Sequence, residues 1–170
     1  SMGFTEGFYY KPRVDMEVLR KHSKGLVALS ACLAGSIPSH IMDGNYEAAK
    51  KAALLYNEIF GQGNFYLELQ DHGIKEQSLV NQEVVRMSRE TGIPLIATND
   101  VHYVDKEDAA AQDILLCIQT GKSVQEENRL KFQGQEFYLK SPEEMYELFK
   151  YAPDALENTG KIAEMCNLEF

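Results

Sequence analysis

Side chains that bind metal ions follow two apolar runs of this 170-residue chain. Asp100 and His102 come directly after the run 94–98, and Cys32 comes after the run 25–30. Residues i and i+2 of an extended segment point the same way, so Asp100 and His102 can reach one cation. Thiolates, carboxylates and imidazoles are ligands of zinc, manganese and iron. These three residues are therefore candidates for one metal site.

Each candidate also has a structural interpretation, which the residue types alone leave open. Asp100 can cap a turn while His102 packs on Tyr103, and Cys32 can be a small core residue. His72 is a further candidate metal ligand, but it can equally hydrogen-bond a loop backbone. For Asp100 and His102, the position after a buried strand gives the functional interpretation the same weight as the structural one, because active sites of parallel α/β folds lie at the carboxyl ends of strands.

The segments that must position these residues alternate between short apolar runs, which predict strands, and apolar residues at steps of three and four, which predict helices. Glu68 lies inside one predicted strand and can point either into a barrel or at solvent. Each connection between strands is long enough for a crossover, so neighbouring strands are expected to be parallel. The fold class is α/β, either an open doubly wound sheet or part of a barrel. The predicted strands are 25–30, 65–70 and 94–98, and the predicted helices are 46–60, 80–91 and 105–121.

The final third of the chain contains a clear helix start. Ser141 is a good N-cap, Pro142 suits the first helical position, and Glu144 completes a capping box. Residues 135–140 are a candidate strand, and a last helix follows Pro153.

Composition narrows the class of protein. The chain has 17 Lys and Arg against 26 Asp and Glu, a net charge of −9, and 44% hydrophobic residues. These values exclude a disordered chain and argue against a broad phosphate-binding face. No apolar run approaches the roughly 20 residues that span a bilayer. The spacing of the three cysteines excludes a zinc finger, and Cys117 and Cys166 are predicted to be small buried residues.

Six stretches resemble the PHP (polymerase and histidinol phosphatase) domain of bacterial DNA polymerase III alpha subunits. They are GFYYKPR (7–13), ALSACLAG (28–35), FYLELQDHG (65–73), PLIATNDVHY (94–103), LLCIQTGK (115–122) and FYLKSPEEM (137–145). The resemblance implies a partial βα barrel with parallel strands alternating with helices, in which Cys32, Asp100 and His102 match late metal ligands of the family. It implies that the intact parent, a DNA-directed DNA polymerase, holds zinc, manganese or iron for 3′→5′ exonuclease or phosphoesterase chemistry. The alternative is a catalytically silent scaffold that stabilises the polymerase and docks a proofreading partner.

The resemblance also sets expectations for what this chain lacks. Ser1 before Met2 indicates an expression-tag remnant over residues 1–2, so residues 3–170 are expected to be the C-terminal portion of the domain. The family's opening H-x-H motif has no match here, and the polymerase carboxylates would lie beyond residue 170. The chain alone is therefore expected to be inactive and to bind no complete metal cluster. DNA, deoxynucleoside triphosphates and other replicase subunits are the expected partners of the cytoplasmic parent, and an exposed sheet edge could pair copies of the chain.

Overall fold

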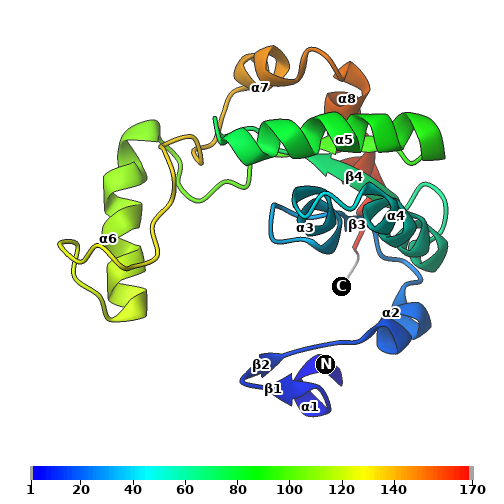
Figure 1. The fold of residues 1–170 in the computed structure, drawn as a ribbon, viewed down its shortest axis with the longest axis horizontal. Coiled ribbons are helices and arrows are strands. Elements are labelled where there is room, and N and C mark those ends of the chain that lie inside the picture. The colour runs from blue at the N-terminus through cyan, green and yellow to red at the C-terminus, as the bar shows by residue number, and fades with distance from the viewer. Residues whose placement is uncertain (1, 169–170) are drawn as a thin grey trace.

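Figure 1 shows the computed structural model, which describes residues 2–168. Its elements in chain order are α1 (Met2–Thr5), β1 (Phe8–Tyr9), β2 (Lys11–Pro12), α2 (Met16–His22), β3 (Ala28–Leu29), α3 (Ser36–Met42), α4 (Tyr46–Phe60), β4 (Phe65–Leu69), α5 (Lys75–Thr91), β5 (Leu95–Ala97), the 3₁₀ turn η1 (Lys106–Asp108), α6 (Ala109–Thr120), α7 (Pro142–Phe149) and α8 (Pro153–Met165).

The central sheet has the order β3-β4-β5, and both of its strand pairs are parallel. Ala28 pairs with Phe65, and Leu67 pairs with Leu95. The predicted α/β class and the parallel order of the three strands are thus confirmed. Within the described residues β3 and β5 form the edges of this sheet, and the barrel that the resemblance implies stays a prediction.

The core forms around β4, the middle strand. Its residues Phe65, Leu67 and Leu69 are almost fully buried and belong to one apolar cluster. Helices α3, α4 and α5 and the start of α8 contribute Ile37, Ile41, Ala49, Ala53, Val80, Val84, Met87 and Ala155, and the cluster also includes Ile93, Ala97, Phe149 and Ala152. Because side chains alternate along a strand, Glu68 projects from the sheet face opposite to this core.

Local sequence signals set the helix boundaries. Asp105 and Asp108 form a capping box at η1, which leads directly into α6. Ser141 caps α7, where its hydroxyl accepts from the Glu144 amide at 3.2 Å and the Glu144 carboxylate accepts from the Ser141 amide at 2.7 Å. Both predicted helix starts are confirmed. Their donors and acceptors are only three residues apart, so the sequence alone brings them together.

Residues 135–140 do not form the predicted strand. A single parallel bridge joins Tyr103 to Tyr138 in that segment. The amide of the Asn99 side chain donates instead to the carbonyl oxygens of Glu136 and Tyr138, and the His102 backbone amide donates to Phe137. The backbone bonds of this segment to residues 102–104 are limited to Phe137 and Leu139, and the Asn99 side chain binds two further carbonyl oxygens.

The cysteine and α6 predictions are partly corrected. Cys117 is buried as predicted, but Cys166 caps the end of α8 and is exposed. Figure 1 shows α6 standing apart from the sheet, which explains why Leu115 and Ile118 of its apolar run are exposed. None of the helices within residues 2–168 has the length and apolarity needed to cross a membrane.

Candidate functional site

The candidate residues follow the carboxyl ends of the three parallel strands. Cys32 follows β3, His72 follows β4, and Asp100 and His102 follow β5. Parallel pairing brings these three strand ends to one edge of the sheet. The fold therefore puts the predicted candidates on the edge where α/β proteins carry their chemistry.

Asp100 and His102 lie in the loop that follows β5, which is not the extended segment that the sequence predicted. Asp100 adopts a left-handed conformation with φ of 43°, and its carbonyl oxygen accepts a 2.6 Å hydrogen bond from His102 Nδ1. The carboxylate Oδ1 of Asp100 lies 4.0 Å from the same nitrogen. Since Nδ1 carries the proton in this bond, the lone pair lies on Nε2. A metal-binding histidine characteristically donates its second ring N–H to a backbone carbonyl in this way.

His72 has the opposite arrangement. Its ring is buried, and Nε2 donates to the carbonyl oxygen of Asn99 at 2.8 Å. Nδ1 accepts from the Gln77 side-chain amide at 2.8 Å, and the ring stacks on Phe137 with a centroid distance of 4.0 Å. Nε2 thus joins the end of β4 to the end of β5, and Nδ1 joins it to α5. Because both nitrogens are engaged, this arrangement favours the structural interpretation of His72.

Cys32 lies on the other side of β4, in a tight turn after β3. It is an exposed free thiol, and the residue before it, Ala31, is left-handed with φ of 67°. The Ala31 amide donates to Glu68 Oε2 at 3.0 Å. Cys32 and Glu68 line one small cavity together with Gln70. Sequence reasoning left the direction of Glu68 open, and the structure turns this carboxylate toward the neighbouring strands.

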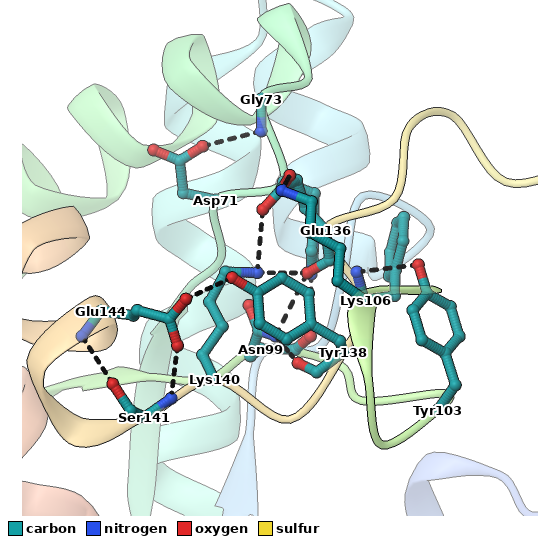
Figure 2. Close-up of polar contacts among 12 residues, drawn as sticks. Asp71, Gly73, Asn99, Tyr103, Lys106, Glu136, Tyr138, Lys140, Ser141 and Glu144 are labelled. Carbon is teal, nitrogen blue, oxygen red and sulfur yellow. Dashed lines mark hydrogen bonds and ion pairs between the residues drawn. The ribbon is translucent and has the colours of Figure 1, made fainter. Parts of the chain in front are cut away.

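A second polar cluster holds the loop that follows α6 against the end of β5 (Figure 2). Lys106 and Lys140 bind the Glu136 carboxylate at 2.6 and 3.3 Å. The Lys106 ammonium is the main cause of the lowered pKa of Glu136. Tyr138 donates to Glu144 at 2.5 Å, which raises the pKa of the Tyr138 hydroxyl to about 12.

Cys32, Asp100 and His102 are side chains of types that bind divalent metals, but they do not form a complete metal site. A thiol, a carboxylate and an imidazole with an open Nε2 suit zinc, manganese or iron. However, no three Cys, His, Asp or Glu side chains within residues 2–168 converge closely enough to hold an ion. Asp100 and His102 come together, whereas Cys32 does not join them in such a group.

The comparisons of this chain with known proteins agree with one another. The PHP domain family matches residues 1–72. The DNA polymerase III alpha subunit of Borreliella burgdorferi is 54% identical over 98% of this chain, and that of Treponema pallidum is 48% identical over all of it. The corresponding subunit of Thermus aquaticus is 41% identical over the full chain. The chain spans only 14% of the length of each of these relatives. Residues 1–72 are therefore similar to the PHP domain family, and nearly all of the chain is similar to part of bacterial DNA polymerase III alpha subunits.

Proposed function

We propose that this chain is a PHP region of a replicative DNA polymerase, and that it contributes Cys32, Asp100 and His102 to a divalent-metal site of the intact subunit. The proposal extends to 3′→5′ exonuclease or related phosphoesterase chemistry at that site. The observation that supports it is the orientation of His102, whose Nδ1 is held by the Asp100 carbonyl and whose Nε2 forms no hydrogen bond with any of residues 2–168. The whole subunit would polymerise DNA from deoxynucleoside triphosphates in the cytoplasm, together with other replicase subunits.

The side chains of this chain would have distinct tasks in such a site. A bound metal would activate water and neutralise charge on a scissile phosphate. His102 offers a neutral nitrogen in a fixed orientation, and Asp100 offers a carboxylate that can bridge two ions. Cys32 would bind the metal as a thiolate, and a thiolate ligand favours zinc or iron as the bound metal. The net charge of −9 gives this region little affinity for DNA by itself, so the polymerase would deliver the strand.

Metal analysis and nuclease assays of the intact alpha subunit test this proposal. We expect Asp100→Ala and His102→Ala to lower both bound metal and exonuclease activity while polymerase activity persists. His22→Ala is the matched control, because His22 is an exposed imidazole at the end of α2. An intact subunit without bound metal would refute the proposal. So would Asp100 and His102 variants with the metal content of the unmodified protein.

The silent scaffold is the second candidate function. The lack of a three-ligand group within residues 2–168 favours it, as does the structural engagement of His72. In that case the region would stabilise the polymerase and dock a proofreading partner. The same Asp100 and His102 variants would then leave both exonuclease activity and the melting temperature of the subunit unchanged.

A further inference from the structure

One carboxylate, that of Glu68, joins the ends of all three parallel strands. On the β3 side, Glu68 Oε2 accepts from the Ala31 amide at 3.0 Å, and the Glu68 amide donates to Ser30 Oγ at 2.8 Å. On the β5 side, Glu68 Oε1 accepts from the Thr98 hydroxyl at 2.5 Å. The side-chain amide of Gln70, the residue directly after β4, donates to the same oxygen at 3.1 Å. The side chain thus connects three segments that are far apart in the sequence.

These contacts sit directly beside the candidate metal ligands. Ala31 immediately precedes Cys32, and Thr98 lies two residues before Asp100. The left-handed conformation of Ala31 is unfavourable for a residue with a Cβ, and it persists only where surrounding contacts hold it. The bond from the Ala31 amide to Glu68 is such a contact. Loss of this carboxylate would therefore release the turn that carries Cys32.

The geometry points to Glu68 as a positioning residue, whose carboxylate fixes Cys32 relative to Asp100 and His102. This inference rests on the proposed function, because it assigns Glu68 a task toward the same metal site. A carboxylate suits the task because both of its oxygens accept hydrogen bonds, and here they meet donors from Ala31, Thr98 and Gln70. An amide at this position would turn an N–H group toward at least one of these donors. Glu68 itself is not assigned as a metal ligand.

Cobalt(II) titration of the metal-free intact alpha subunit tests the inference. A cysteine thiolate bound to cobalt gives a near-ultraviolet charge-transfer band, so the band reports Cys32 independently of catalysis. We expect Cys32→Ala to abolish it. Glu68→Gln and Glu68→Ala should lower the cobalt affinity by about 10- to 100-fold, the usual effect of losing a residue that orients ligands, with the larger effect for alanine.

Two further variants keep the test sharp if Glu68→Ala fails to fold. Thr98→Val keeps the side-chain shape and removes only the donor from the β5 side, so it should lower the cobalt affinity less than Glu68→Gln does. Glu58→Gln is the matched control, because Glu58 is an exposed carboxylate on α4 that pairs with Arg20. It should leave the affinity and the band unchanged. Polymerase activity of each variant reports whether the subunit remains folded.

The outcomes separate this inference from the proposed function. Unchanged affinity and band in both Glu68 variants, with the band lost in Cys32→Ala, would overturn the positioning role and leave the proposed function standing. A loss of polymerase activity in Glu68→Gln parallel to the loss of the band would assign a merely structural role and overturn the inference too. An unmodified subunit without the band, or a Cys32→Ala variant that retains it, would overturn the proposed function and this inference together.

Discussion

Replacement of Lys140 by methionine should destabilise the chain by about 2 kcal/mol. The Lys140 side chain is only 3% exposed, and its ammonium binds the Glu136 carboxylate at 3.3 Å and the Glu136 carbonyl oxygen (Figure 2). It also lies 4.2 Å from the centroid of the Tyr138 ring. A hydrogen bond to a charged group contributes about 1.5–3 kcal/mol. Methionine fills similar space, and Glu136 keeps its bond to Lys106, so the cost should stay within that range.

Substitution of the other partner, Glu136→Gln, should lower the free energy of unfolding by more, about 3 kcal/mol. It leaves the buried Lys140 ammonium without the Glu136 carboxylate, and breaking one partner of a buried pair typically costs about 3–5 kcal/mol. The Glu136 side chain is 33% exposed, so the cost falls at the lower end of that range. The amide oxygen of glutamine and the backbone carbonyl offset part of that cost. In the double variant the uncompensated charge is absent, so its total should be about 2 kcal/mol smaller than the sum of the single effects.

Urea unfolding followed by far-ultraviolet circular dichroism measures these free energies. Lys150→Met is the matched control, because Lys150 is 66% exposed and pairs only loosely with Glu147 at 3.5 Å. Its free energy of unfolding should change by less than about 0.5 kcal/mol. A Glu136→Gln variant as stable as Lys140→Met would contradict the reasoning. Strictly additive effects in the double variant would contradict it as well.

Three further predictions concern acid stability, tight backbone packing and a glycine inside a helix. Hydrogen bonds, first from Lys50, lower the pKa of Glu90 to about 2, so the stabilisation is present above the ordinary value of 4.5 and is lost as the pH falls toward 2. Glu90→Gln should therefore lower the melting temperature at pH 7 but not at pH 2, as thermal denaturation at both values can check. A Cβ on Gly35 would lie 2.5 Å from the Ser30 carbonyl oxygen, so Gly35→Ala should destabilise by about 1–3 kcal/mol. Gly160→Ala, which meets nothing within 4 Å in the middle of α8, should instead stabilise by about 0.5–1 kcal/mol in the same urea assay.

Much of the fold follows from interactions between residues close in the chain. The apolar periods predicted α4, β4 and α6, and the capping boxes at Asp105 and Ser141 predicted two helix starts. The predicted strand 135–140 is reduced to one bridge, and the side chain of Asn99, which is distant in sequence, binds two of its carbonyl oxygens. An apolar period of two residues indicates only which side chains can lie on one face of a strand. It does not predict the hydrogen-bond partners of the backbone.

The candidate site was also predicted only in part from the sequence. The sequence alone determined that Asp100 and His102 lie close together, because only one residue separates them, and it placed Cys32 after another strand of the same parallel sheet. Only the tertiary structure decided that His72 is held by hydrogen bonds at both ring nitrogens and that Glu68 ties the strand ends together. Those outcomes depend on which side chains meet across β3, β4 and β5, and such meetings are set by packing of the whole sheet rather than by any local pattern.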